Sequence, residues 1–202
     1  DRSFQDQARM IVAFLSQIGV TQANIVGHDT GGAVALILAI EHANLVDRLV
    51  ITNSVCYDRF DDDMLDFGHP LRWKPRPVSA LVDALDESLA AGFSNPGQLT
   101  PEFREGIIAP WASEEGKLSL LRNASALNAN QTMALVDRHG DISAPTLILW
   151  AMDDPWQKLE DGKRLAHEIP GARFQAIEGA SHWVQQDAPE AFSKALLAFF
   201  AD

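Results

Sequence analysis

Asp29 stands in a short motif whose residue types and spacing fit nucleophilic chemistry. It is the centre of Gly-x-Asp-x-Gly, with Gly27 and Gly31 two residues to either side. This pattern matches the Gly-x-Ser-x-Gly nucleophile elbow with aspartate in place of serine. Such a turn holds its central residue in a strained backbone conformation and points it out of the fold. Side chains two residues to either side of it would collide, so we expect that both Gly27 and Gly31 are required for steric reasons.

A second interpretation of the same residues is structural. Aspartate is a favourable helix N-cap, and the glycines then merely allow close packing. A helix that begins at about Thr30 would point its free N–H groups and the positive end of its dipole at Asp29. A nucleophilic Asp29 should therefore stay ionised. The hexapeptide alone leaves both interpretations open.

The elements around the motif predict an α/β fold with a parallel sheet. An apolar run at 24–28 precedes the motif and eight apolar residues, 33–40, follow it, which indicates a strand, an abrupt turn and a buried helix. Further elements are predicted from apolar runs and helical spacing: strands at 48–53, 145–151 and 173–177, and helices at 3–18 and 188–200. Nearly continuous apolar strands that alternate with helices are typical of a parallel sheet covered on both faces.

Residues 55–139 interrupt this alternation. The stretch is too long for a loop in a compact domain, and its segments at about 78–92, 101–109 and 115–137 look helical. We therefore expect a helical cap, 55–139, inserted over the carboxyl ends of the strands. Residues 1–54 and 140–202 then form the core.

The insertion begins with a cluster of aspartates that resembles a calcium loop only superficially. An EF-hand that starts at Asp61 needs glycine at position 66, where Asp66 stands. For this cluster, which comprises Asp58, Asp61, Asp62, Asp63 and Asp66, we expect a solvated face.

Composition limits the partners of the chain. The formal net charge is −12, which argues against nucleic acids and anionic membrane surfaces. No apolar run approaches the ~18 residues needed to span a bilayer, and the first residues do not resemble a signal peptide, so we expect a soluble, cytoplasmic protein. The single cysteine, Cys56, excludes an internal disulfide and a Cys-x-x-Cys motif. We expect it to be a core residue at a strand end.

Two further chemically capable positions follow predicted strands. Asp153 and Asp154 come after the strand at 145–151, and His182 comes after the strand at 173–177. Ligands of open α/β sheets bind beyond the carboxyl ends of the strands, so Asp29, Asp154 and His182 are predicted to converge on one crevice. Taken singly, Asp154 could be a turn residue and His182 a surface histidine.

The neighbouring histidine, His28, is expected to be structural or to line a pocket. A metal site built from His28, Asp29, Asp154 and His182 is not favoured, because the sequence lacks a Glu-x-x-His or similar ligand pair.

The order of Asp29, Asp154 and His182 along the chain, nucleophile then acid then histidine, is that of the α/β-hydrolases. The chain resembles the C-terminal two-thirds or so of such a hydrolase, of the subgroup with a nucleophilic aspartate that includes haloalkane and fluoroacetate dehalogenases and epoxide hydrolases. The segments that carry the resemblance are 24–32, 147–156 and 178–189. By this likeness Asp29 is the nucleophile, His182 the base and Asp154 the acid that orients it. Asp153 is a possible substitute for Asp154.

The resemblance implies a two-step hydrolysis of a small apolar substrate by water, without a cofactor. A carboxylate attacks an sp³ carbon, forms an alkyl-enzyme ester and expels a halide or alkoxide. The histidine then takes a proton from the water that attacks the ester, and the acid holds the imidazole in the useful tautomer.

The chain departs from the subgroup in the residues that receive the leaving group. Thr30 follows Asp29, where haloalkane dehalogenases usually have tryptophan and fluoroacetate dehalogenases have arginine. Tyr57 is the only tyrosine, so the tyrosine pair of epoxide hydrolases cannot exist. Indole N–H groups of Trp111, Trp156 and Trp183 could face a leaving halide, although packing is the simpler role for each. The residues thus lean slightly towards carbon–halogen cleavage.

The resemblance also covers only part of the fold. A complete fold of this kind has eight strands, and the last four are found here. The absent part includes the loop that completes the oxyanion hole, so the backbone N–H of Thr30 is one donor without its companion. We expect a fragment with an exposed sheet edge, or a second chain that fills the gap. Two alternatives remain: a non-catalytic remnant or binding module, and a hydrolase of acyl substrates in which Asp29 acts as a base.

Overall fold

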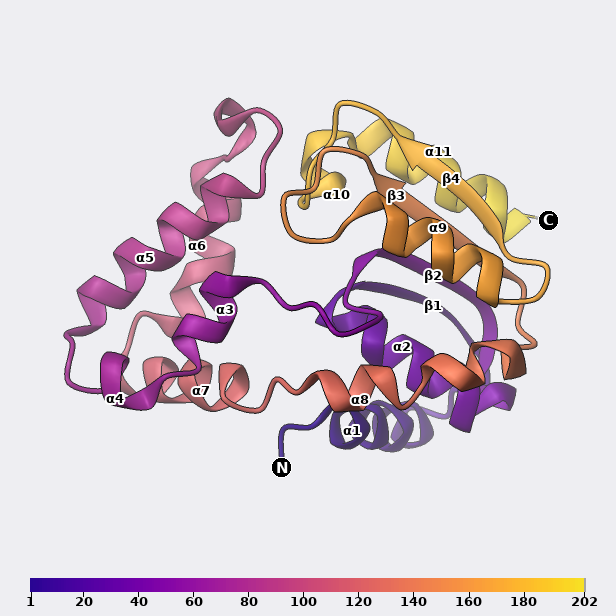
Figure 1. Cartoon of the computed structure of the whole chain (residues 1–202), viewed down its shortest axis with the longest axis horizontal. Helices are drawn as coiled ribbons and strands as arrows, with labels where there is room; N and C mark the ends of the chain where they lie inside the picture. The colour runs from indigo at the N-terminus through magenta and orange to yellow at the C-terminus, as the bar shows by residue number, and fades with distance from the viewer. Residues whose placement is uncertain (202) are drawn as a thin grey trace.

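The computed structural model describes residues 1–201 and contains a four-stranded parallel sheet in the order β1-β2-β3-β4. The strands are β1 (Ala23–Asp29), β2 (Val46–Ser54), β3 (Thr146–Ala151) and β4 (Arg173–Ile177). Each pairs in parallel with its neighbour, so all four carboxyl ends lie along one edge (Figure 1). The predicted α/β fold class and all four predicted strands are confirmed.

Helices cover both faces of this sheet. On one face lie α1 (Phe4–Gln17), α2 (Thr30–Glu41) and α9 (Leu159–Glu168), and on the other lies α11 (Pro189–Ala201). Side chains of β3 alternate between the two: Ile148 and Trp150 pack with α2, whereas Leu147 and Leu149 pack with α11. Every residue of β3 is buried, because a strand in the middle of such a sheet faces apolar helices on both sides.

The residues between β2 and β3 are helical, as predicted. We call residues 55–139 the insert; its helices are α3 (Asp62–Phe67), α4 (Pro70–Trp73), α5 (Val78–Ala91), α6 (Pro101–Ile108), α7 (Glu114–Ala124) and α8 (Ala129–Met133). Short 3-10 turns at 43–45, 96–98, 109–111 and 136–141 complete the connections. The segment predicted to be helical at 115–137 is divided into α7 and α8, because the side chain of Asn128 accepts a hydrogen bond from the N–H of Asn130 and starts a new helix, α8.

The insert has its own apolar core and stands beside the sheet (Figure 1). Phe67, Trp73 and Leu81 pack with side chains of α7, and Leu89 packs with Phe93 and Ile108. Its last residues return to the sheet layer, where Leu135 joins the cluster around α2.

The aspartate cluster at the start of the insert is only partly a solvated face. Asp61 accepts hydrogen bonds from the backbone N–H groups of Asp63 and Met64, both at 3.1 Å, and so caps α3. Asp66 pairs with Arg72 and accepts the indole N–H of Trp73 at 3.0 Å. Capping and pairing therefore account for two of the five aspartates.

Three further expectations can be compared with the structure. Cys56 is buried two residues after the end of β2, as expected of a core residue. β1 lies at the edge of the described sheet, and its Val26 is 42% exposed. Within residues 1–201, no helix is long and apolar enough to cross a membrane.

Candidate active site

Asp29 ends β1 and immediately precedes α2, in a backbone conformation that L-residues rarely adopt. Its φ is 51° and its ψ is −128°, and holding a residue in such a region costs about 1–3 kcal/mol. Its side chain makes no capping hydrogen bond to α2. The structure therefore shows the strained turn and not the N-cap that the second interpretation of the motif required.

Glycine is required at two positions of this turn, and one differs from expectation. A Cβ on Gly27 would lie 2.7 Å from the Cα of Gly32 and 2.8 Å from the carbonyl oxygen of Gly31, so the prediction for Gly27 is confirmed. The prediction for Gly31 is wrong, because a Cβ there would meet nothing within 4 Å. The second constrained position is Gly32, where a Cβ would lie 2.1 Å from the Oγ of Ser54 at the end of β2.

The acid and the histidine form a buried pair. His182 Nδ1 lies 2.9 Å from Asp154 Oδ2, and the two residues are 4% and 7% exposed. Asp154 Oδ1 accepts the backbone N–H groups of Trp156 at 2.8 Å and Gln157 at 2.9 Å. Asp153 leaves its side chain exposed, so Asp154 is the residue that meets the histidine.

Asn53 holds the side chain of Asp154 in place and was not among the site residues predicted from the sequence. Its Nδ2 donates to Asp154 Oδ2 at 2.8 Å, and its Oδ1 accepts the N–H of Ala151 at 2.9 Å. It ends the apolar run of β2 with a φ of 38°, a value for which asparagine is enriched. An asparagine at the carboxyl end of a buried strand was the available signal.

The charges of the three residues act on one another. Burial by itself would lower the pKa of His182, but the hydrogen bond that its Nδ1–H donates to Asp154 and the charges of Asp29 and Asp154 outweigh burial and raise the pKa. Burial by itself would raise the pKa of Asp154, but the hydrogen bond and charge of His182 outweigh it and lower the pKa. Asp29 and Asp154 thus both favour a protonated His182.

His28 supports the histidine from the side of β1. His28 Nε2 donates to the carbonyl oxygen of His182 at 2.9 Å, and the two rings are 4.6 Å apart. Burial, together with the charge of His182, lowers the pKa of His28 to about 4. A neutral His28 that carries its proton on Nε2 fits both observations.

The three candidate tryptophans occupy different places. The ring of Trp156 meets His182 edge-on at 4.8 Å. The indole N–H of Trp183 donates to the carbonyl oxygen of Leu89 at 3.1 Å, which fits the packing role and not the alternative in which this N–H faces a leaving halide. Trp111 lies in the insert, where it packs against the cluster that contains Leu120.

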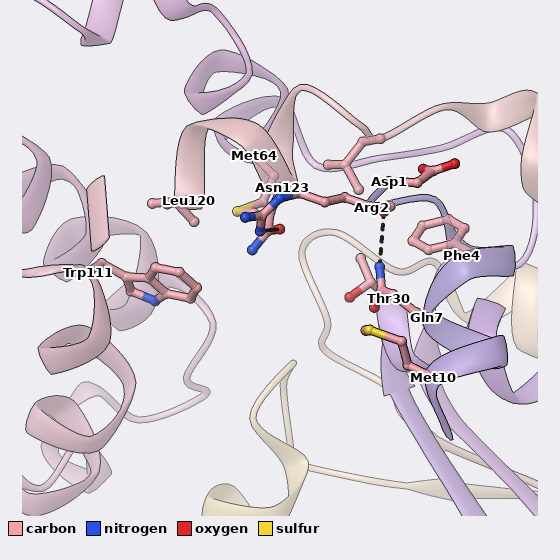
Figure 2. Close-up of a pocket in the computed structure, with 11 residues that line it drawn as sticks. Asp1, Arg2, Phe4, Gln7, Met10, Thr30, Met64, Trp111, Leu120 and Asn123 are labelled. Atoms are coloured by element: carbon pink, nitrogen blue, oxygen red, sulfur yellow. Dashed lines mark hydrogen bonds between the residues drawn. The ribbon is translucent and has the colours of Figure 1, made fainter. Parts of the chain in front are cut away.

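A cavity of about 710 Å³ lies between α1, the Asp29 turn and the insert. Figure 2 shows Thr30, Phe4 and Met10 on one side and Trp111 and Leu120 on the other. The side chain of Arg2 reaches across it to Asn123. Thr30 joins this cavity to the turn, whereas Asp29, Asp154 and His182 are not among its lining residues.

Within residues 1–201, no three His, Cys, Asp or Glu side chains are grouped so that they could hold a metal ion. His182 Nδ1 already bonds to Asp154, and His28 Nε2 bonds to a carbonyl.

Comparison with known proteins identifies the family to which the chain belongs. A 2-hydroxy-6-oxononadienedioate/2-hydroxy-6-oxononatrienedioate hydrolase of Dechloromonas aromatica is 23% identical over 203 residues, which cover 95% of this chain and 66% of that protein. A hydrolase of the same name from Comamonas testosteroni is 27% identical over 202 residues, with coverages of 96% and 68%. The chain thus spans about two thirds of the length of these relatives.

A solved structure agrees at the level of the fold. The alpha/beta hydrolase fold protein from Burkholderia ambifaria superposes with a TM-score of 0.90 at 24% identity, over 98% of this chain and 73% of that one. The names of the two curated relatives do not support the expected dehalogenase or epoxide hydrolase subgroup. Residues 1–189 match the family model for the alpha/beta hydrolase fold, and the chain therefore belongs to the alpha/beta hydrolase fold family.

Proposed function

We propose that the protein is a hydrolase in which Asp29 forms a covalent ester with the substrate and His182 directs water to hydrolyse it. The observation that carries this proposal is the strained φ of 51° at Asp29, in a turn where Gly27 and Gly32 leave no room for a Cβ. The buried Asp154–His182 pair supplies the matching base. Residues 55–139 serve as the cap, and residues 1–54 and 140–202 as the core.

The first step needs the carboxylate alone. An oxygen of Asp29 attacks an sp³ carbon, a C–O bond forms, and the bond to the leaving group breaks with its electron pair. A carboxylate suits this carbon, because its attack on an ordinary ester would give a high-energy anhydride. Thr30 and Trp111, which line the cavity beside the turn, are the proposed substrate contacts.

The second step needs the histidine. His182 takes a proton from water at its Nε2, the hydroxide adds to the ester carbonyl of Asp29, and the alcohol leaves with the proton. Asp154 stabilises the imidazolium through Nδ1. The backbone N–H of Thr30, in the first turn of α2, has no intrahelical acceptor and is the proposed donor to the oxyanion.

Mass spectrometry of a His182→Gln variant tests this sequence of steps. With 1-bromobutane or 1,2-epoxyhexane as the probe, we expect a stable mass increment on the peptide that contains Asp29, because attack proceeds while hydrolysis stalls. A His182→Gln, Asp29→Asn double variant is the control and should stay unmodified. No increment with either probe would favour a non-catalytic binding module.

The names of the relatives favour a second candidate, hydrolysis of a carbonyl compound such as a 2-hydroxy-6-oxo-dienoate. Asp29 would then act as a base towards water. A single turnover in ¹⁸O-water separates the two. The ester route places the label in the carboxylate of Asp29, since water attacks its carbonyl carbon, whereas the base route places it directly in the product.

A further inference from the structure

The loop that carries His182 is fastened to the insert. We call residues 178–188, between β4 and α11, the histidine loop; it includes the short helix α10 (Val184–Asp187). The backbone N–H of Trp183 donates to the carbonyl oxygen of Gly92 at 3.1 Å, and its indole N–H donates to that of Leu89. Figure 1 shows this end of α5 beside α10. The residue next to His182 is thus bound to the insert through both backbone and side chain.

Asp187 makes a second connection, through its carboxylate. The side chain is buried, with 9% of the residue exposed. Its Oδ2 accepts the backbone N–H of Ser181 at 2.8 Å and that of Ser94, in the insert, at 3.0 Å. Its Oδ1 has no hydrogen-bond partner within residues 1–201. One oxygen therefore joins the residue before His182 to the insert.

The packing around these bonds is close. A Cβ on Gly92 would lie 2.7 Å from the indole nitrogen of Trp183 and 2.8 Å from the ring of Trp156. Trp156 in turn meets the imidazole of His182 edge-on. Any movement of the insert at Gly92 therefore reaches the rings that flank His182.

We propose that Asp187 is a positioning residue: by holding Ser181 and Ser94 on one oxygen, it fixes His182 for the water step when the insert is seated on the histidine loop. This inference rests on the proposed function. Asp29 does not need His182 to attack the substrate, whereas hydrolysis of the ester does. Loss of Asp187 should therefore slow the second step and spare the first.

Single-turnover kinetics of Asp187→Ala with 1-bromobutane, followed by mass spectrometry, measures the two steps separately. We expect formation of the adduct at close to the wild-type rate and its hydrolysis slowed by ~100-fold, the usual effect of an ångström-scale misplacement. Asp187→Asn keeps an accepting oxygen and should recover most of the loss. Glu190→Gln changes an exposed carboxylate at the start of α11 and should behave as wild type.

A second variant reaches the same contact without changing Asp187. Gly92→Ala forces a methyl group against Trp183 and should give the same slow hydrolysis. Gly106→Ala, in α6, is the matched control, because a Cβ there meets nothing within 4 Å.

The outcomes separate the inference from the proposed function. Suppose that His182→Gln accumulates an adduct. The positioning role is then wrong if Asp187→Ala hydrolyses its own adduct at the wild-type rate, or if Asp187→Ala slows formation and hydrolysis of the adduct equally. If His182→Gln forms no adduct, the proposed chemistry has failed. The positioning role is then decided by NMR titration of His182, which needs no substrate. Asp187→Ala should move the pKa of His182 towards its ordinary value, and an unchanged pKa overturns the role.

Discussion

Two histidines within one site have opposite protonation preferences, and each preference has a structural cause. His182 faces two carboxylates, whose charges and hydrogen bond raise its pKa despite burial. His28 faces a carbonyl and another imidazole, and its pKa falls to about 4. The site thus places one titrating base beside a neighbour that stays neutral.

The raised pKa of His182 sets the acidic limit of the water step. Because only neutral His182 accepts a proton, the rate of ester hydrolysis should rise with pH as His182 loses its proton. The ester removes the charge of Asp29, so in the adduct the hydrogen bond and charge of Asp154 are what oppose the effect of burial and hold this midpoint up. Asp154→Asn removes the hydrogen-bonded charge, so the midpoint should move to lower pH and the plateau should fall by ~10²–10⁴-fold. Hydrolysis of a preformed adduct, measured from pH 5 to 9, checks this; an unmoved midpoint would contradict it.

The lowered pKa of His28 predicts a pH dependence of stability. Between about 4 and 6.5 the unfolded chain binds a proton at His28 that the folded chain does not, so the free energy of unfolding should fall as pH falls through this window. The loss should reach about 1–2 kcal/mol at pH 5. Urea denaturation at pH 7 and pH 5 measures it. His28→Gln should lose this part of the difference, while His42→Gln serves as a comparison at another histidine.

At the scale of elements, the strands and the order of the site residues follow from the sequence, whereas the fine geometry of the turn does not. The two central strands, β2 and β3, are buried almost throughout, and the apolar runs that predict the strands are a local pattern. Whether Gly31 or Gly32 is constrained depends on Ser54, which belongs to another strand. The partner of the Trp183 indole lies 94 residues away. Contacts of this kind have no local pattern, and the short helices α3 and α4 also escaped prediction because each spans only one or two turns.

The two adjacent glycines of α2 should differ in their tolerance of alanine. Gly31→Ala adds a methyl group in open space and should change the free energy of unfolding by less than about 1 kcal/mol, in the stabilising direction, because alanine favours helix. Gly32→Ala drives a Cβ into the Oγ of Ser54 and should destabilise by about 1–3 kcal/mol or more. Equal effects of the two changes in chemical denaturation would be incompatible with the described packing.

At the scale of the whole molecule, β1 and β4 are the two edge strands of the described sheet. β1 leaves its outer backbone groups unpaired within that sheet. Apolar side chains of β1, α1 and α2, among them Ile25, Val26 and Val34, line a cavity of about 390 Å³ along this edge. A free strand edge beside apolar surface favours pairing with another chain.

A protein of these 202 residues should therefore self-associate. We expect the weight-average mass in sedimentation equilibrium to rise with concentration, and Val26→Lys to reduce the rise, because a charged side chain on an edge strand opposes pairing. Leu197→Lys changes an apolar residue on α11 that is even more exposed than Val26 and should not. A monodisperse monomer at every concentration would contradict this prediction.

The backbone at Asp29 is bent by the glycines around it and by the junction with Ser54, and not by the carboxylate itself, which makes no bond to the helix it precedes. The backbone conformation of the turn therefore does not depend on which reactive side chain stands at position 29. A hydroxyl or a thiol placed at this one position would inherit the same exposure and the same histidine. In such a fold, a change in the kind of bond that is cleaved requires a change of the side chain at this position and not a new backbone around it.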